Sequence, residues 1–327
     1  MRVPALRWAL CWLGVCGAIL SSLVLTRGPT DTAPAQPVAV GRSVPAAAPT
    51  TTAPQEAASD VSVPASFVPA PLGCRLVTYT PPAATAPQQG QLCEPGNPTG
   101  VAMILIHGGG GTGGTRTDTD LWAVEYRRRG ITTFAIDYRL VDPAVDDGVW
   151  PVPEQHVKAA AQFLRTQADE LGLTSIQLHG FSAGARLAAV ALTTPDDPAF
   201  AGPDRWDDIS DAVDGAVLFY GYYNDFVYEP DAYWGDTPVP VEAQPELMAA
   251  GANAPALLVH GDVDFLVPAA ESIGLAAALR VASHDQTLWI VGGQPDHGFD
   301  GYGTGVLSEA GAELVEPILD WVRGIAG

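Results

Sequence analysis

One serine in this sequence stands where a reactive nucleophile is expected. Ser182 lies in the stretch GFSAG, residues 180–184, between a strand-like run, SIQLH, and a helix-forming run, ARLAAVAL. A serine on such a sharp strand-to-helix turn projects its hydroxyl oxygen above a sheet, and glycine is required because bulky neighbours would clash. The five-residue pattern alone is weak evidence, because the chain contains 35 glycines. Its flanking strand and helix favour a nucleophile over a chance serine in an alanine-rich helix.

A run of glycines follows another apolar strand. The stretch HGGGGTGG, residues 107–114, comes directly after VAMILI. Consecutive glycines allow backbone amides to turn toward a developing oxyanion without steric obstruction. A phosphate-binding loop would need Gly-Lys-Ser/Thr at its end, whereas Thr115, Arg116 and Thr117 follow here. A flexible loop without a catalytic role remains the other interpretation.

Two later loops supply an acid and a base. The stretch HGDVDFLVP, residues 260–268, contains Asp262 and Asp264, either of which could orient a catalytic histidine. We expect Asp262 to shape the turn and Asp264, further out, to be the acid, although a surface turn without a role stays open. His297 stands in QPDHGFDGYG, after a further strand-like run. The order Ser, Asp, His is the one found in α/β-hydrolases.

The other five histidines are assigned structural or surface positions. His179 and His260 end strand-like runs, and His107 is expected to brace the glycine loop. His156, in a helix, and His284, before a strand, are expected at the surface. No metal-binding motif is present, so the sequence implies no cofactor.

The elements that must position these residues alternate between strand and helix. Predicted strands cover residues 101–108, 131–139, 175–180, 215–221, 256–261 and 286–293. Predicted helices cover 120–130, 153–172 and 308–325, the last kinked or restarted at Pro317. This alternation predicts an α/β fold, a mostly parallel sheet with helices on both faces. In such sheets, chemistry gathers beyond the carboxyl ends of the strands.

Five motifs, in this order, carry a family resemblance: ILIHGGGG, AIDYRL, LHGFSAGARLAA, VHGDVDFLVP and PDHGF. Together they resemble the α/β-hydrolase superfamily, within the carboxylesterase and lipase group that has a His-Gly-Gly-Gly motif. That group includes hormone-sensitive-lipase-like enzymes and acetyl- or feruloyl-esterase-like enzymes. The resemblance implies that Ser182 is the nucleophile, Asp264 the acid and His297 the base. It also implies that the oxyanion is bound by the backbone amides of Gly108, Gly109 and Ala183.

The chain departs from this family pattern in two places. Phe181 stands where hormone-sensitive-lipase-like members carry Asp, and a linker replaces their N-terminal cap helices. The first departure, at Phe181, favours the polysaccharide-esterase-like side. We therefore expect a serine carboxylic-ester hydrolase acting on short- or medium-chain or carbohydrate-linked esters. A peptide hydrolase and a non-catalytic binding module are the alternatives. The aromatic stretch 219–235 either stacks on a substrate or forms a satellite core.

Three segments are expected along the chain. Residues 1–27 read as an export signal or membrane anchor, because Arg2 and Arg7 precede or adjoin a long uncharged apolar run. Residues 28–72, rich in Pro, Ala and Thr, are expected to be a disordered linker, and 73–327 the catalytic domain. The net charge of -21 argues against nucleic acid as a partner. The protein is expected to be secreted or anchored outside the cytoplasmic membrane.

Two cysteines flank the first expected hairpin. Cys74 and Cys93 enclose RLVTYTPPAATAPQQGQL, which has strand-like ends and a turn-forming middle. In an exported domain, a disulfide between them would staple this hairpin. Two unpaired thiols are the alternative. Cys11 and Cys16 lie in the apolar N-terminal run.

Overall fold

The computed structural model describes residues 73–142, 144, 149–224, 231–234 and 238–326. The predictions for residues 1–27 and 28–72 lie outside the described residues. Within the described ranges, no helix has the length and apolar character needed to cross a membrane.

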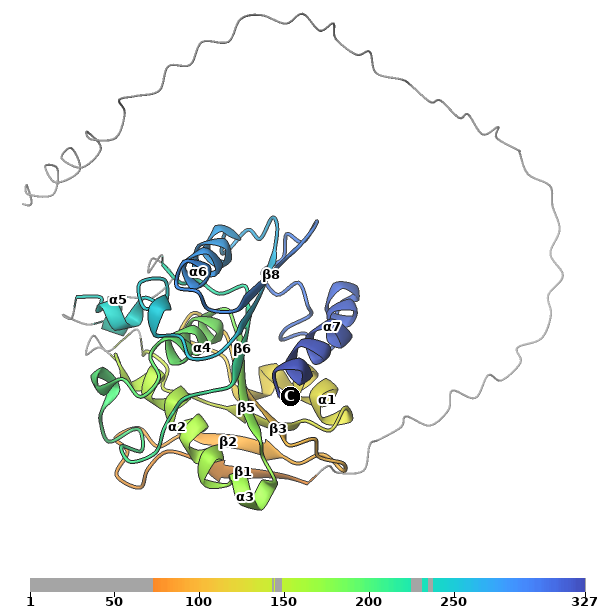
Figure 1. The fold of residues 1–327 in the computed structure, drawn as a ribbon. Coiled ribbons are helices and arrows are strands. Elements are labelled where there is room, and N and C mark those ends of the chain that lie inside the picture. The colour runs from red at the N-terminus through yellow and green to blue at the C-terminus, as the bar shows by residue number, and fades with distance from the viewer. Residues whose placement is uncertain (1–72, 143, 145–148, 225–230, 235–237, 327) are drawn as a thin grey trace, which may run out of the picture. The chain divides into compact units, whose positions relative to one another are not determined.

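A single sheet organises the described residues (Figure 1). Its eight strands lie in the order β1-β2-β4-β3-β5-β6-β7-β8. Only the pairings of β1 with β2 and of β2 with β4 are antiparallel, and all others are parallel. The strands are β1 Cys74–Thr78, β2 Gln89–Cys93, β3 Val101–Ile106, β4 Thr132–Ile136, β5 Ser175–Phe181, β6 Gly215–Phe219, β7 Ala256–Gly261 and β8 Gln286–Val291. The predicted α/β class and N-terminal antiparallel hairpin are confirmed.

Helices cover both faces of this sheet, as Figure 1 shows. The helices are α1 Asp120–Arg128, α2 Val152–Thr166, α3 Ala168–Leu171, α4 Ala183–Thr193, α5 Asp231–Trp234, α6 Ala270–Val281 and α7 Glu309–Ile325. Side chains of α1 and α7 pack into one hydrophobic core, and those of α2, α4 and α6 into the other. Strand β3 explains this division, because its alternate side chains enter opposite cores. It is therefore apolar at every position, as expected of a strand buried on both faces.

Two details of the sequence-based expectation differ from the structure. Of the kink or the restart expected at Pro317, the restart is wrong, because helix α7 continues through this residue. His156 is fully buried rather than at the surface. Its Nδ1 accepts a hydrogen bond from the Arg139 amide at 3.0 Å, and its Nε2 lies 3.6 Å from Asp204 Oδ1. Burial lowers the pKa of His156 to about 4, although Asp204 acts in the opposite direction. The helical pattern could not reveal a polar residue facing a loop that packs over it.

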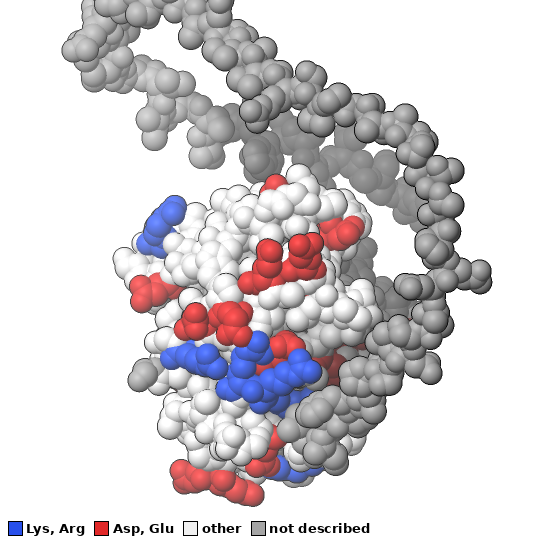
Figure 2. All heavy atoms as spheres, turned by 90° about the vertical axis from the view of Figure 1, so that its right-hand side faces the viewer, with Lys and Arg blue, Asp and Glu red and all other residues white. Residues whose placement is uncertain are grey.

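The face that carries α1 and α7 has basic and acidic side chains side by side (Figure 2). Arg128 and Arg129 both pair with Glu125 on α1, at 2.8 and 2.5 Å. Arg129 also pairs with Glu316 on α7 at 2.6 Å, which ties the two helices together. Ion pairs at a protein surface typically stabilise a fold by no more than about 1 kcal/mol each.

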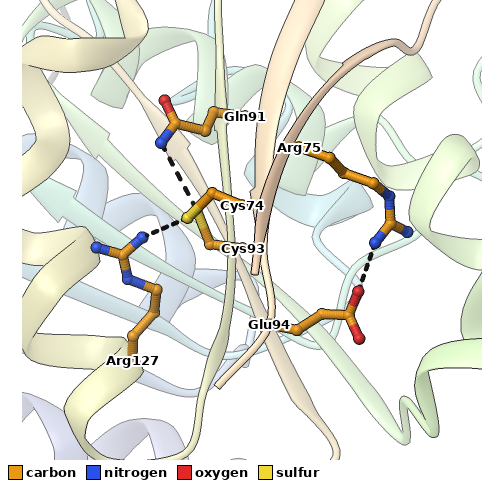
Figure 3. Close-up of a disulfide and its surroundings, with 6 residues drawn as sticks. All are labelled: Cys74, Arg75, Gln91, Cys93, Glu94 and Arg127. Carbon is orange, nitrogen blue, oxygen red and sulfur yellow. Dashed lines mark hydrogen bonds and ion pairs between the residues drawn. A yellow bond between two sulfur atoms is a disulfide. The ribbon is translucent and has the colours of Figure 1, made fainter. Parts of the chain in front are cut away.

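A disulfide joins Cys74 to Cys93, as the sequence predicted, and links strand β1 to β2 (Figure 3). Strand β1 is an edge strand with mostly exposed side chains, so little apolar burial holds it in place. The Arg127 guanidinium on α1 donates a hydrogen bond to Cys74 Sγ at 2.9 Å. The covalent link therefore substitutes for packing at this edge.

Replacing both Cys74 and Cys93 by alanine should lower the free energy of unfolding by about 3 kcal/mol. The disulfide closes the loop between these two cysteines, and a disulfide that closes a loop of this size typically contributes about that amount. Urea unfolding of residues 73–327 measures it, and reduction should add about two mass units to the intact wild-type domain, since two thiols are formed. Glu94→Gln, which removes only the exposed Arg75–Glu94 ion pair, is the control and should cost less than about 1 kcal/mol. Equal stability of the double variant and the control would contradict the prediction.

Candidate active site

Ser182 lies on a strained turn between β5 and α4. Its backbone has φ 51° and ψ −117°, a region that residues other than glycine rarely adopt. The Ser182 amide donates to the Phe219 carbonyl at 2.9 Å, which fixes the turn against β6. The Ser182 carbonyl in turn accepts from the amides of Ala185 and Arg186, the first hydrogen bonds of α4. The strand and helix thus enforce a conformation that costs of order 1–3 kcal/mol.

The two glycines around Ser182 are required by space. A Cβ on Gly180 would lie 2.3 Å from the Gly184 carbonyl oxygen, and one on Gly184 would lie 2.2 Å from the Ile106 carbonyl oxygen. Both obstacles are backbone atoms, which cannot rotate away. The contact with Ile106 also brings the first turn of α4 against the end of β3, where the glycine loop begins.

The structure brings Ser182, Asp264 and His297 together. His297 Nε2 lies 2.7 Å from Ser182 Oγ, and His297 Nδ1 lies 2.7 Å from Asp264 Oδ2. The three residues follow β5, β7 and β8, so parallel strands deliver them to one edge of the sheet. A neutral imidazole between these two residues donates a hydrogen bond from Nδ1 to the Asp264 carboxylate. Its Nε2 can then accept the proton of Ser182.

Several groups hold the Asp264 carboxylate in its charged form. Its Oδ1 accepts from the amides of Leu266 and Val267 at 2.8 and 2.9 Å. Its Oδ2 faces His297 and lies 3.5 Å from His260 Nε2. Burial acts to raise the pKa of Asp264, but the hydrogen bonds from both histidines and from the Val267 amide outweigh it. The pKa is therefore well below its usual range.

His260 and Asp262 have supporting places around this acid. His260 Nδ1 lies 2.7 Å from Ser272 Oγ and its Nε2 lies 2.9 Å from the Val267 carbonyl, so the ring braces the acid loop. The contact of His260 with Asp264 was not predicted from the sequence. A usable signal was present, because Asp264 follows His260, at the end of a strand, by four positions. Asp262 accepts from the Gln294 amide at 3.1 Å, which connects the loops after β7 and β8.

The glycine loop lies directly beside the serine. A Cβ on Gly108 would be 3.1 Å from Ser182 Cβ. Of the three amides predicted to bind an oxyanion, the Gly108 amide donates to the Tyr302 hydroxyl at 2.7 Å. The amides of Gly109 and Ala183 donate to none of the residues that the structure describes. Gly108 is thus engaged within the protein, while the other two amides are free for a ligand.

The described part of the aromatic stretch 219–235 is mainly core. Phe219 and Tyr220 are buried in the cluster under the site, and the Tyr220 ring lies 4.8 Å from the His297 ring. Tyr233 and Trp234 belong to a separate buried cluster with Val141, Val149 and Ala243. The satellite-core interpretation fits these residues. Positions 225–230 and 235 lie outside the described residues.

Gly184→Ala should destabilise the protein by about 2–3 kcal/mol or more, because the added methyl group meets the Ile106 carbonyl. Urea unfolding measures the loss. Gly324→Ala, in α7 with nothing within 4 Å of its added Cβ, is the control and should be neutral or stabilising by up to about 1 kcal/mol. Wild-type stability in the Gly184 variant would show that the turn has room to relax.

Asp264 should make stability depend on pH in acid. The unfolded chain binds a proton at this carboxyl near pH 4, whereas the folded protein does so only at much lower pH. The stabilisation from Asp264 is therefore fully present above about pH 5 and is lost as the pH falls. Asp264→Asn should be less stable than wild type at pH 7 and should lose less stability between about pH 5 and pH 3. Urea unfolding across this range measures both slopes, with the exposed Asp208→Asn as control, and equal slopes would refute the assignment.

Comparison with known proteins finds a matching family and several similar proteins. Residues 94–231 match the BD-FAE family. Three curated proteins of Mycobacterium tuberculosis are similar in sequence. Esterase LipC is 28% identical over 229 residues, 61% of this chain and 53% of LipC. Esterase LipQ is 29% identical over 194 residues, 54% of this chain and 45% of LipQ. The probable carboxylic ester hydrolase LipM is 27% identical over 224 residues, 62% of this chain and 50% of LipM. The chain thus spans about half the length of these relatives.

Solved structures show the same fold. Esterase Est2 of Thermogutta terrifontis, with propionate bound, superimposes with a TM-score of 0.66 at 22% identity, covering 77% of this chain and 94% of Est2. A truncated carbohydrate esterase from gut microbiota gives a TM-score of 0.62 at 18% identity, covering 77% of this chain and 96% of the esterase. The sheet order and these matches show an α/β-hydrolase fold, in a chain that is similar to the BD-FAE family over residues 94–231 and to curated esterases.

Proposed function

We propose that this protein hydrolyses carboxylic esters through an acyl-enzyme on Ser182. The observation that carries the proposal is the continuous hydrogen-bonded chain from Ser182 Oγ through His297 to Asp264, built on a strained turn. Backbone strain at a residue whose side chain is joined to a base and a carboxylate is typical of an activated nucleophile.

The first half of the reaction forms the acyl-enzyme. His297 Nε2 takes the Ser182 proton while Oγ attacks the ester carbonyl carbon, and the carbonyl π electrons move to oxygen. His297 then gives that proton to the departing alkoxide, which leaves as the alcohol. Asp264 remains ionised and stabilises the imidazolium formed between these two steps.

Backbone amides stabilise the negative oxygen of the tetrahedral intermediate. The free amides of Gly109 and Ala183 are the proposed donors, since the Gly108 amide is already bonded to Tyr302. Ala183 is the first residue of α4, so the helix N-terminus adds favourable potential at this point. Loss of one such donor costs about 2.7–4 kcal/mol in related systems.

The second half of the reaction uses water. His297 accepts a proton from the water as its oxygen attacks the acyl carbon, and returns that proton to Ser182 Oγ as the acid departs. Each cycle therefore cleaves one ester with one water and restores the enzyme.

Short- or medium-chain acyl esters and carbohydrate-linked esters are the proposed substrates. The LipM relative is described as a probable carboxylic ester hydrolase. Est2 has been solved with propionate and with butyrate, and the gut relative is a carbohydrate esterase. Peptide hydrolysis and a purely binding role are less well supported, because nothing in the site favours an amide and all three reactive side chains are joined.

We also propose that the enzyme works outside the cytoplasmic membrane. The apolar N-terminal run in residues 1–27 supports export, and residues 28–72 would act as a linker to the catalytic domain. The Cys74–Cys93 disulfide supports an oxidising compartment. Retention of the N-terminal run would tether the enzyme to the membrane, whereas its cleavage would release it.

Ser182→Ala should lower the rate of hydrolysis of p-nitrophenyl acetate and butyrate by at least about 10³-fold, because the nucleophile is removed. The same variant should no longer react with a fluorophosphonate probe. Ser210→Ala is the matched control, because Ser210 lies before β6 at the opposite edge of the sheet, and it should keep wild-type rates and labelling.

The proposal makes a second comparison possible. Wild type should cleave esters faster than the corresponding p-nitroanilides, since an ester has the better leaving group. Hydrolysis by Ser182→Ala at the wild-type rate, or wild-type protein that is labelled by the probe yet cleaves none of the esters, would overturn the function.

A further inference from the structure

The glycine loop beside Ser182 has little stiffness of its own. Glycines occupy positions 108–111, 113 and 114, and glycine loses more conformational freedom on ordering than any other residue. An oxyanion donor has to be placed accurately, because a displacement of about 1 Å can cost up to about 10²-fold in rate. Groups outside the loop must therefore hold it.

The first peptide of the loop is held on both sides. The Tyr138 hydroxyl donates to the His107 carbonyl at 2.9 Å, and the Gly108 amide donates to the Tyr302 hydroxyl at 2.7 Å. A trans peptide is planar, with its carbonyl and its amide pointing to opposite sides. The two tyrosines thus fix the plane of the His107–Gly108 peptide.

The next peptide along the chain starts from the Gly108 Cα, which that plane places. The Gly108 carbonyl lies 2.8 Å from His107 Nδ1, so the Gly108–Gly109 peptide is fixed on its carbonyl side. Its amide, that of Gly109, must then point away from the His107 ring. Gly109 has φ 119°, which only glycine adopts readily, and its own carbonyl accepts from the amides of Thr112 and Gly113 at 3.2 and 3.1 Å. The direction of the free donor depends on the anchors one residue earlier.

Tyr302 is itself held rigidly. Its ring stacks on Phe181 with centroids 5.0 Å apart and planes 25° apart. Two positions earlier in its loop, the buried Asp300 carboxylate accepts from Trp122 Nε1 at 2.7 Å and from the Tyr220 hydroxyl at 2.9 Å. Burial also raises the pKa of Tyr302, so the hydroxyl stays neutral at ordinary pH.

We propose that Tyr302 is a positioning residue for oxyanion binding, whose hydroxyl clamps the Gly108 amide and thereby aims the Gly109 amide at the substrate. This inference rests on the proposed esterase function. Tyr302 lies on the same loop as His297. This one segment therefore carries the general base, His297, and also holds the glycine loop through Tyr302. It also explains why Phe181 precedes the serine, since its ring is the surface against which Tyr302 packs.

A clamp of this kind acts on the transition state rather than on bound substrate. The ester carbonyl carries little charge before attack, and a misaligned amide weakens binding mainly when the oxygen becomes an oxyanion. Removal of the clamp should therefore lower kcat and leave KM nearly unchanged. An aryl trifluoromethyl ketone, whose carbonyl adds the Ser182 hydroxyl to give a hemiketal, should lose affinity in parallel.

The experiment uses Tyr302→Phe, which keeps the ring on Phe181 and removes only the hydroxyl. With p-nitrophenyl butyrate, kcat should fall about tenfold, KM should stay within about twofold, and the trifluoromethyl ketone should bind about tenfold more weakly. Thr193→Val is the control, because it removes another buried hydroxyl, which donates to the Ala189 carbonyl at 2.9 Å at the far end of α4 from Ser182. The control should keep the wild-type kcat and inhibitor affinity.

A second measurement uses wild-type protein and does not depend on how the variant folds. By NMR, the Gly108 amide should exchange with solvent more slowly than the Gly110 amide, which donates to none of the described residues. In folded Tyr302→Phe, the Gly108 amide should exchange as fast as that of Gly110.

Three results would overturn the clamp. The first is equal exchange of Gly108 and Gly110 in wild type. The second is an unchanged kcat in Tyr302→Phe with only a lower melting temperature, which would make the hydroxyl merely structural. The third is a higher kcat, which would mean that the hydroxyl obstructs the site. Each of these differs from failure of the esterase function, in which wild type itself would not cleave esters.

Discussion

The close contact between the first turn of α4 and the end of β3 is the constraint on which the site depends. Gly184 meets the Ile106 carbonyl so closely that no side chain fits between them. This contact places Ser182 beside Gly108 and fixes the serine in its strained conformation. The strain is sustained because β5 and α4 are both fully buried, so relaxing the turn would unpack two elements.

The remaining reactive residues reach this point through loops that are tied to one another. Asp262 binds the Gln294 amide, and the Phe265 amide donates to the Pro295 carbonyl at 3.2 Å. These bonds connect the acid loop with the loop of His297. Parallel strands bring both loops to the same edge of the sheet, and the cross-links set the spacing that a 2.7 Å hydrogen bond between Asp264 and His297 needs.

His297 is positioned both by electrostatics and by packing. Asp264 stays charged because two backbone amides and two histidines compensate for its burial. Beneath the imidazole, Tyr220 supplies an aromatic surface and a hydroxyl that bonds to Asp300. Asp300 faces neutral donors, and burial raises its pKa. The charged carboxylate thus orients the base, while the second carboxyl group anchors its loop to the core.

The sequence by itself determined the α/β class, the approximate strands and helices, the disulfide and the identity of the three residues that meet at the site. It could do so because apolar runs, turn glycines and the order of polar residues after strands are local properties of the chain. The contact of His260 with Asp264 was missed, although the spacing of four between them was a usable signal. The burial of His156 was not predictable, because it depends on a loop that folds back over a helix. The same holds for the Gly108 amide. Its partner, Tyr302, lies 194 positions along the chain, and only tertiary packing on Phe181 brings that hydroxyl to the glycine loop.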